Sequence, residues 1–598
     1  MLGTIPEVPY RKYADVVADW LVELGYTHCF FLAGGNSMHL LDACRTRFTC
    51  VATVHEVAAG VAAEYYNESG GDGRAFVLVT AGPGLTNIIT AMAGAFTESR
   101  ELLVLGGQVK SSDLATDGLR QRGIQEVDGV ALTSPVTVVS RRIERPLGRR
   151  EFEEMVLRGR GPRPGPVFLE FCLDAQGAPV DGDDLDDGRG RVTPLPAVRA
   201  PQFAAIQELL FRAKRPIVLL GGGVSRTAAS EVVPRLVELG VPLMTTYNGA
   251  DRVDSRAPTY LGRPNTWGMR SANVLIQQAD LVLALGTRLG LQQTGFNWQA
   301  FAPLATLVQV DIDARELVKG HPHVDLALPA DADDVLRRLS DGAPLDVGAW
   351  LDFARGVRQR LPLVEQVNSH AAGYVDPYAF YRDLSAVCLP SDAVIPCSSG
   401  GAFTVFYQSF LQRAGQVIIS NKSLASMGYG LAGSVGAALA HPGRRTVHIE
   451  GDGSFAQNLQ ELGTVAINHL PVKTFLFSNE GYASIRMTQR NYFGGSYLGC
   501  DTSTGLGFPD WPLVAAAYGI PCLVLSPGWD EDQAFRELFD APGPALFVVP
   551  IDPEQSYYPK ISSRVTADGS MESNPLHLYT PDLPPDVHAA VMPHLPAP

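Results

Sequence analysis

The residues best suited to chemistry are a carboxylate and a carboxamide that each follow an apolar run. Asp452 lies in the segment 450–455 after the run 446–449, and Asn479 follows the run 474–477. If both runs are parallel strands, their carboxyl ends lie at one sheet edge, which is where open α/β sheets bind ligands. Mg²⁺ prefers such oxygen ligands and takes the others from phosphates and water. The pair therefore predicts a metal site bridged to a diphosphate.

Glu56 is the candidate for proton transfer. It is the only acid in the apolar segment 51–59, whose pattern predicts a short strand followed by the start of a helix. A glutamate at a helix N-terminus is more often a capping residue than a catalyst. Proton transfer also requires a carboxylate held close to its substrate, so both interpretations of Glu56 stay open at this point.

The elements that must position these residues are strands of parallel α/β sheets. Short β-branched runs alternate with longer helical patterns along nearly the whole chain, which is typical of such sheets. We expect strands at 76–80, 102–106, 167–171, 217–220, 281–285, 307–310, 394–396, 417–420, 446–449, 474–477 and 546–549.

A chain of 598 residues is too long for one hydrophobic core. The segment 174–198 is rich in Gly, Pro and Asp, which predicts an exposed linker. We expect an α/β protein with three doubly wound parallel-sheet domains and an irregular C-terminal tail. The predicted boundaries are 1–180 (first domain), 181–199 (linker), 200–345 (central domain), 346–375 (linker helix), 376–556 (third domain) and 557–598 (tail).

Composition and charge exclude several classes of function. A formal net charge of -15 disfavours binding to nucleic acid or to anionic membranes. Eight scattered cysteines form no C-x-x-C pair, so neither a zinc site nor a disulfide framework is indicated. We find no signal peptide and no segment apolar for long enough to span a bilayer. We therefore expect a cytoplasmic enzyme that acts on small molecules.

Motifs around these residues resemble those of one enzyme family. The segments GDGSF at 451–455 and SNEGY at 478–482 resemble the thiamine-diphosphate motif. The segments TAGPGLTN at 80–87 and GGQV at 106–109 resemble the pyrimidine-binding domain of the acetohydroxyacid synthase group. The likeness covers essentially the full length, in the family's order of pyrimidine, central and diphosphate domains. It implies thiamine diphosphate and Mg²⁺ as cofactors.

The resemblance implies roles for individual residues. Asp452, the side chain of Asn479 and the carbonyl of Gly481 would bind Mg²⁺. Glu56 would share a proton with the aminopyrimidine ring of the cofactor, and Met427 would hold the cofactor in a bent conformation. The residues expected to contact the cofactor are Gly34, Gly35, Glu56, Thr80, Pro83, Asn87, Ser398, Ser399, Gly400, Met427, Gly451, Gly453, Ser454, Tyr482, Ala483 and Ser484.

Two glutamines complete the expected catalytic set. Gln108 and Gln125 would face the reacting carbonyls as hydrogen-bond donors to a developing alkoxide. The alternative is that both make structural hydrogen bonds in loops. In this family the cofactor lies between the pyrimidine domain of one subunit and the diphosphate domain of another. The resemblance therefore also implies a homodimer or a homotetramer.

Two positions depart from acetohydroxyacid synthase where that enzyme selects its second 2-oxo acid. Gln292 replaces an arginine that grips the acceptor carboxylate, so bidentate recognition is lost. Arg490 replaces a tryptophan that shapes the acceptor pocket, which suits a polar or extended acceptor. The segments 119–128, 482–495 and 571–578 are similar to the branch that attaches two-carbon units to deoxy-keto-sugars, as in yersiniose formation.

We therefore expect a carboligase that decarboxylates a 2-oxo acid such as pyruvate and adds the acyl fragment to a ketone or aldehyde. The acceptor would be a keto-sugar, including a nucleotide-linked one, or a free or carrier-bound ketone of secondary metabolism. The alternatives are acetolactate synthesis from two pyruvates and an inactive cofactor-binding scaffold or regulatory subunit. FAD also stays open, because the glycines at 221–223 and the loop 266–269 match a domain that binds flavin in some relatives and is empty in others.

Overall fold

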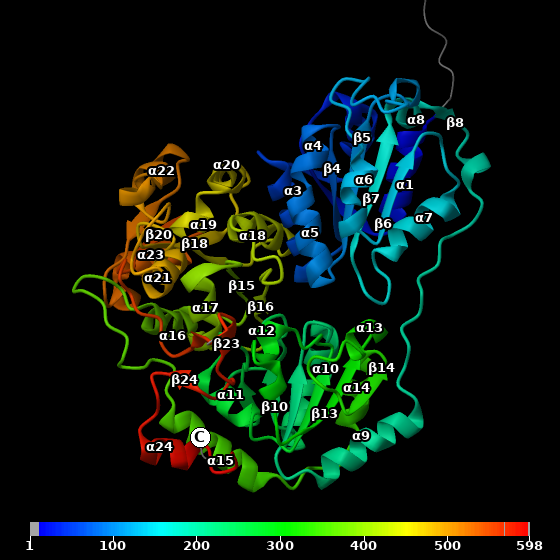
Figure 1. Ribbon diagram of the computed structural model, residues 1–598. Helices are drawn as coiled ribbons and strands as arrows, with labels where there is room; N and C mark the ends of the chain where they lie inside the picture. The colour runs from blue at the N-terminus through cyan, green and yellow to red at the C-terminus, as the bar shows by residue number, and fades with distance from the viewer. Residues whose placement is uncertain (1–10, 567, 596–598) are drawn as a thin grey trace, which may run out of the picture.

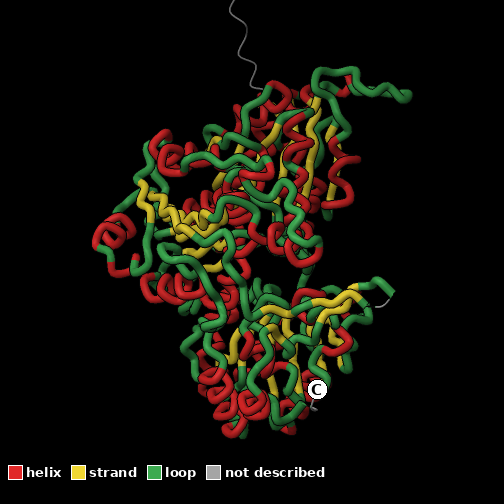
Figure 2. Tube along the Cα trace, turned by 60° about the vertical axis from the view of Figure 1, so that its left-hand side comes forward, coloured by secondary structure: helices red, strands yellow, loops and turns green. Residues whose placement is uncertain are grey.

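The computed structural model describes residues 11–566 and 568–595. It contains three parallel sheets of six strands each, with helices packed around every sheet (Figures 1 and 2). The predicted α/β class with three parallel-sheet domains is therefore confirmed. Residues 1–10 of the first predicted domain, and residues 567 and 596–598 of the predicted tail, lie outside the described residues.

The N-terminal sheet, at the upper right in Figure 1, has the strand order β3-β2-β4-β5-β7-β6. Its strands are β2 (Tyr26–Phe31), β3 (Thr49–Ala52), β4 (Arg74–Val79), β5 (Leu102–Gln108), β6 (Val139–Ile143) and β7 (Pro166–Cys172). Its helices are α1 (Tyr13–Glu23), α2 (Met38–Cys44), α3 (Glu56–Ser69), α4 (Pro83–Asn87), α5 (Ile89–Glu98), α6 (Gly129–Thr133), α7 (Arg149–Arg158) and α8 (Leu173–Gly177). A two-stranded ribbon of β1 (Arg11–Lys12) and β8 (Pro179–Val180) joins the two ends of this domain.

The central sheet, at the bottom of Figure 1, has the order β11-β10-β9-β12-β13-β14. Its strands are β9 (Pro216–Leu220), β10 (Leu243–Thr245), β11 (Tyr260–Gly262), β12 (Leu281–Leu285), β13 (Thr306–Asp311) and β14 (Leu326–Pro329). Its helices are α9 (Ala200–Arg212), α10 (Arg226–Glu238), α11 (Arg270–Ile276), α12 (Leu291–Thr294), α13 (Ala314–Leu317), α14 (Ala332–Ser340) and α15 (Gly348–Arg360).

The third sheet, at the left in Figure 1, has the order β16-β15-β17-β18-β20-β19. Its strands are β15 (Ala393–Pro396), β16 (Val417–Ile418), β17 (Thr446–Gly451), β18 (Val472–Ser478), β19 (Cys522–Val524) and β20 (Ala545–Pro550). Its helices are α16 (Pro377–Val387), α17 (Gly400–Ser409), α18 (Tyr429–Ala440), α19 (Asp452–Phe455), α20 (Leu462–Ile467), α21 (Ala483–Tyr492), α22 (Trp511–Ala517) and α23 (Gln533–Asp540).

The predicted strands lie in the interior of each sheet, except for β16, which is an edge strand. Every predicted run overlaps an observed strand, and β5, β9 and β12 are buried along their whole length, which explains their continuous apolar sequences. The sequence analysis missed strands such as β6, which lies at a sheet edge and carries Arg141 and Arg142. An edge strand need not be apolar on both faces, so its sequence lacks the signal.

The C-terminal segment is more regular than the predicted irregular tail. It contains β21 (Lys560–Ile561), β22 (Ser563–Val565), β23 (Met571–Ser573), β24 (Tyr579–Thr580) and α24 (Pro585–Val591). Leu576 and Val591 are buried in the same core cluster as Trp350 of α15. The segment is thus packed on the central domain, as Figure 1 shows for α24 beside α15. The expectation of an irregular tail was wrong for these elements, because such short strands have no periodic pattern.

The first and third domains share one hydrophobic core, centred on α3 and α18, which lie side by side in Figure 1. A Cβ on Gly436 of α18 would lie 1.9 Å from the carbonyl oxygen of Ala62 in α3, so glycine permits this close approach. At the same contact Glu64 of α3 is fully buried and forms an ion pair of 2.8 Å with Arg100. The two domains are therefore packed as one body within the chain.

No helix among the described residues combines the length and the apolarity needed to cross a bilayer.

Candidate functional site

Asp452 and Asn479 meet at the carboxyl edge of the third sheet, where β17 and β18 are hydrogen-bonded neighbours. The Oδ2 atom of Asp452 accepts hydrogen bonds from the backbone N–H of Asn479 at 3.0 Å and of Glu480 at 2.9 Å. Its Oδ1 atom accepts one from the N–H of Gly453 at 2.7 Å. The structure thus brings together the carboxylate and the carboxamide that the sequence analysis paired.

Both side chains of this pair are buried, which makes a bound cation favourable. Asp452 is 1% exposed, and burial raises the pKa of its carboxyl from 3.8 to about 6, although the backbone hydrogen bonds lower it. The Oδ1 atom of Asn479 is buried and has no hydrogen-bond partner among the described residues. Leaving such an atom without a partner is costly. A divalent cation between the two side chains would satisfy it and would keep Asp452 ionised, so this donor set fits Mg²⁺.

Gly481 belongs to a segment held beside Asp452 by backbone contacts. Its φ is 155°, and a Cβ at this position would lie 2.1 Å from the carbonyl oxygen of Cys500. The N–H of Tyr482 donates to the same carbonyl at 2.8 Å. The ring of Tyr482 packs on Gly453, where a Cβ would lie 2.2 Å from it. The segment therefore has the fixed conformation that a backbone ligand to a metal requires.

Arg486 is a residue of this site that the sequence analysis missed. It is 7% exposed on α21, and its Nη2 atom donates to the carbonyl oxygen of Asn479 at 2.7 Å. The carboxylate of Asp501 lies 3.8 Å from its Nη1 atom. A buried guanidinium thus fixes the backbone next to the candidate metal ligand. The contact depends on the fold, and the only hint in the sequence is an arginine in the helix that Ala483 and Ser484 begin.

The loop 397–400 follows β15, which pairs with β17, so it lies at the same edge. Ser399 is the N-cap residue of α17, and Gly400 has a φ of 79°. Ser398 is fully buried, and its Oγ atom has no hydrogen-bond partner among the described residues. The first N–H groups of a helix are ready donors to an anion. This loop is therefore able to bind part of a diphosphate.

Met427 is half-buried next to the turn that carries Asp452. The N–H of Gly428 donates to Oγ of Ser454 at 3.0 Å. The same hydroxyl donates to Oε1 of Glu450 at 2.5 Å. These bonds fix the Met427 loop against the turn that carries Asp452, and they engage the Ser454 hydroxyl inside the protein. The expected contact of Ser454 with the diphosphate therefore cannot use its side-chain proton.

Glu56 is the first residue of α3 and is 7% exposed. Its Oε2 atom accepts a hydrogen bond from Nδ2 of Asn87 at 3.0 Å. The two preceding N–H groups, of Val54 and His55, both donate to Oε1 of Glu461 at 3.1 Å. The structure thus joins Glu56 to Asn87, and Glu461 of the third domain holds the two residues that precede Glu56.

Gly34, Gly35, Thr80 and Pro83 gather at the carboxyl ends of β2 and β4. A Cβ on Gly34 would lie 2.3 Å from Cβ of Thr80, so the two loops touch. The Oγ1 atom of Thr80 is buried and has no hydrogen-bond partner among the described residues. Gly35 begins a short 3-10 turn, and Pro83 begins α4. These four residues therefore form one surface of the first domain.

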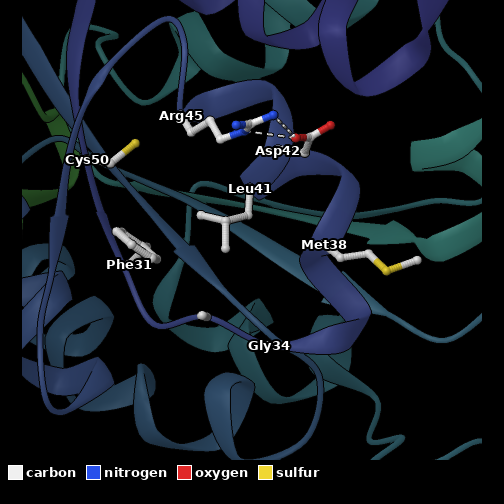
Figure 3. A pocket seen from close by; sticks show the side chains of 8 residues that line it. Phe31, Gly34, Met38, Leu41, Asp42, Arg45 and Cys50 are labelled. Carbon is white, nitrogen blue, oxygen red and sulfur yellow. Dashed lines mark hydrogen bonds and ion pairs between the residues drawn. The ribbon is translucent and has the colours of Figure 1, made fainter.

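A hollow of about 490 Å³ adjoins Gly34, as Figure 3 shows. Its lining is mostly apolar, with Phe31 from β2 and Leu41 from α2. The charged pair at its rim, Arg45 and Asp42, is closed by an ion pair of 2.9 Å. The positive charge of Arg45 is already paired with Asp42 and most of the lining is apolar, so we assign this hollow no cofactor.

Gln108 is engaged in structural hydrogen bonds. It is fully buried at the end of β5, and its Nε2 atom donates to the carbonyl oxygen of Val127 at 2.8 Å and to Oε1 of Glu170 at 3.0 Å. Its Oε1 atom accepts from the N–H of Val109 at 2.9 Å. Both amide hydrogens are thus used, and neither is left for a developing alkoxide. The contacts favour the structural alternative, because Glu170 on the neighbouring strand β7 takes the proton expected to face the substrate.

Three predicted residues remain: Gln125 of the expected catalytic set, and Gln292 and Arg490 of the expected acceptor pocket. Gln125 is exposed, with a φ of 61°, and its backbone packs on the loop before α4. The carbonyl of Gln292 accepts from the N–H and the hydroxyl of Thr266 at 2.8 and 2.9 Å. Arg490 is exposed and forms an ion pair of 2.6 Å with Glu554. No hydrogen bond or ion pair of the described residues joins Gln292 to Arg490, so their common pocket stays a prediction.

Comparison with known proteins assigns each sheet to a family domain. The N-terminal TPP binding domain of the thiamine pyrophosphate enzymes matches residues 11–132, the central domain matches residues 203–339, and the C-terminal TPP binding domain matches residues 399–549. The order of these matches is the order of the three sheets.

Relatives match over nearly the whole length. The acetolactate synthase isozyme 1 large subunit of Escherichia coli (strain K12) is 30% identical, over 92% of this chain and 95% of its own. Acetolactate synthase 2, chloroplastic, of Zea mays is 29% identical, over 92% and 87%. Acetolactate synthase 3, chloroplastic, of Brassica napus is 30% identical, over 93% and 86%. Because the likeness extends through all three domains, the chain belongs to the thiamine pyrophosphate enzyme family, as an acetolactate synthase-like member.

Proposed function

We propose that this enzyme is a carboligase that uses thiamine diphosphate and Mg²⁺ to decarboxylate a 2-oxo acid, with pyruvate as the first candidate, and to join the acyl fragment to a ketone or aldehyde. The observation that carries the proposal is the buried Asp452 beside the Oδ1 atom of Asn479, which has no hydrogen-bond partner in the described part of the chain. The chemistry that thiamine diphosphate supplies when bound is stabilisation of the acyl carbanion left by loss of CO₂.

Asp452, Asn479 and the carbonyl of Gly481 would hold Mg²⁺, and the N-terminus of α17 would receive part of the diphosphate. Arg486 would keep the backbone of Asn479 in place through its 2.7 Å hydrogen bond. These residues would bind and orient the cofactor, whereas the proton-transfer group is proposed to lie in the first domain.

Glu56 is the proposed proton-transfer group. Its carboxylate is bonded to Asn87 rather than to the N–H groups of the first turn of its own helix, which favours proton transfer over helix capping. Asn87 would hold this carboxylate facing the aminopyrimidine ring, where it can hold or release one proton. In the proposed oligomer, Glu56 of one subunit faces the metal pair of its neighbour.

The acceptor is proposed from the two residues that depart from the acetohydroxyacid synthase pattern. A neutral carboxamide at Gln292 cannot grip a carboxylate with two charge-assisted hydrogen bonds. An acceptor without that carboxylate, such as a keto-sugar or a ketone of secondary metabolism, therefore suits this chain better than a second 2-oxo acid. Arg490 would then contact a polar part of the acceptor.

The second candidate is acetolactate synthesis from two pyruvates, and the names of the relatives favour it. The test is to incubate the enzyme, loaded with thiamine diphosphate and Mg²⁺, with pyruvate alone and with a panel of keto-sugars and ketones. We expect CO₂ release and a new product mass only with an acceptor. Acetolactate formed equally fast from pyruvate alone would establish the second candidate, and no CO₂ from any 2-oxo acid would refute both.

FAD is left out of the proposed steps. The glycines after β9 are explained by packing on Gly286. A Cβ on Gly221 would lie 2.2 Å from the carbonyl oxygen of Gly286, and a Cβ on Gly223 would lie 2.8 Å from the Cα of Gly286. The glycine run therefore does not require a nucleotide. Absorbance of the purified protein near the flavin bands decides whether the central domain binds one.

A further inference from the structure

Lys422 is a half-buried cation that the proposed mechanism does not use. It lies in the segment between β16 and α18, and its Nζ atom is 4.6 Å from the centre of the Phe403 ring. Among the described residues, its ammonium has no hydrogen bond and no carboxylate partner, and burial lowers its pKa. The other buried lysine of this domain, Lys473, donates to the carbonyl oxygens of Leu538 and Ala541 at 2.9 and 2.8 Å. Lys422 therefore lacks the hydrogen bonds that offset the desolvation of the Lys473 ammonium.

The segment that carries Lys422 is fixed by both other domains. The N–H of the next residue, Ser423, donates to Oε1 of Glu98 in the first domain at 2.8 Å. Arg288 of the central domain donates through Nη2 to Oγ of Ser423 at 2.7 Å. Glu98 is engaged by this N–H and by Nδ2 of Asn248 at 2.6 Å. The backbone of this segment is thus held, and its position does not depend on Lys422.

The ammonium lies near the carboxyl edge that carries the candidate cofactor site. Phe403, beneath it, belongs to the first turns of α17. The thiol of Cys397, at the end of β15, lies within electrostatic range of Lys422, and it donates to the carbonyl of Ser399 at 3.0 Å. Lys422 is therefore close to the loop 397–400, whose helix N-terminus already favours an anion.

We propose that Lys422 is the counter-charge for a phosphoryl anion bound at the N-terminus of α17. A half-buried ammonium with no partner among the described residues is only partly compensated by water, and phosphoryl oxygens would supply both an opposite charge and hydrogen-bond acceptors. The anion is either the diphosphate of the cofactor or the phosphoryl group of a nucleotide-linked acceptor. The inference rests on the cofactor position given under the proposed function.

The test is binding, measured by calorimetry on the metal-loaded protein freed of thiamine diphosphate. In Lys422→Met we expect the Kd for thiamine diphosphate to rise on the order of tenfold, the usual effect of losing one hydrogen bond to a charged group. Lys422→Arg should restore most of the affinity. If instead the cofactor binds unchanged but UDP, CDP and dTDP lose affinity for the loaded enzyme, the phosphoryl group belongs to the acceptor. Unchanged affinity for all four ligands would overturn the inference.

Lys473→Met is the matched control, because it removes a buried lysine at the opposite end of the same sheet. We expect it to lower the melting temperature and to leave the Kd for thiamine diphosphate as in the wild type. If Lys422→Met also lowers the melting temperature, the Lys422→Arg variant decides between the two explanations. An arginine variant that is folded but binds thiamine diphosphate no more tightly than Lys422→Met would contradict the role of the charge. Failure of the wild-type protein to bind thiamine diphosphate would refute the proposed function itself.

Discussion

Acidification is expected to release Mg²⁺ from this enzyme in a window set by Asp452. The metal binds the ionised carboxylate, so its affinity follows the ionised fraction of the metal-free protein. Because burial raises the pKa of Asp452 to about 6, roughly one carboxyl in ten is ionised at pH 5. The Mg²⁺ affinity should therefore fall about tenfold per pH unit below pH 6 and be constant above about pH 7.

The stability of the metal-free protein should change in the opposite direction. The pKa of Asp452 is raised on folding, so its contribution to stability is fully present below 3.8, the unfolded value, and is lost as the pH rises through about 6. At neutral pH the ionised, buried carboxylate costs about 3 kcal/mol, on the order set by that pKa difference. Saturating Mg²⁺ should remove this pH dependence.

The assay is calorimetric titration of Mg²⁺ at pH 5, 6 and 7 with thiamine diphosphate at a fixed concentration. Asp452→Asn reports the part of the pH dependence that comes from protonation of the cofactor, and Glu480→Gln removes an exposed neighbouring carboxylate as a control. We expect Glu480→Gln to keep the wild-type profile. A wild-type profile parallel to that of Asp452→Asn, or a midpoint near 4, would show that burial does not control this carboxylate.

Four further predictions concern single residues. Glu56→Gln and Asp452→Asn should each abolish carboligation. A purified mixed dimer of the two variants should recover about half of the wild-type rate, because one of its two sites contains neither substitution. No recovery would show that both residues of one site come from the same subunit. Arg486→Met should weaken Mg²⁺ binding on the order of tenfold in a metal titration, with the KM for pyruvate unchanged at saturating metal; an unchanged metal affinity would reduce Arg486 to a packing role. Gln292→Arg should increase acetolactate formation from pyruvate alone, measured as the product ratio, and a fixed ratio would exclude Gln292 from acceptor choice. Gln108→Ala should cost about 1–3 kcal/mol in denaturant unfolding because Glu170 loses a buried donor; full stability with lost activity would restore Gln108 to the catalytic set.

The fold and the meeting of Asp452 with Asn479 were predictable because their signals are local. Runs such as 281–285 are apolar on both faces in a central strand, and Asp452 and Asn479 each follow such a run directly. Two strand ends at one sheet edge need no knowledge of distant packing. The same reasoning placed Glu56 at the start of a helix, where the structure has it.

The features that were missed depend on contacts between segments far apart in the chain. The contacts that favour a structural role for Gln108 come from Glu170, which reaches it across the pairing of β5 and β7. Arg486 is significant only because its helix folds back on Asn479. The spacing of these residues along the chain does not reveal their hydrogen-bond partners. In the sequence alone they therefore look like ordinary polar residues.

The packing of α3 on α18 has a mechanical consequence for an oligomer. Glu56 begins α3, and Met427 directly precedes the N-cap of α18, so the proposed proton-transfer acid and the proposed support for the bent cofactor belong to one packed pair of helices. In the proposed arrangement these two residues serve cofactors in different active sites. If cofactor binding in one site tilts this pair of helices, the cofactor contacts in the other site change as well. Negative cooperativity between the paired sites would then arise without a separate regulatory domain.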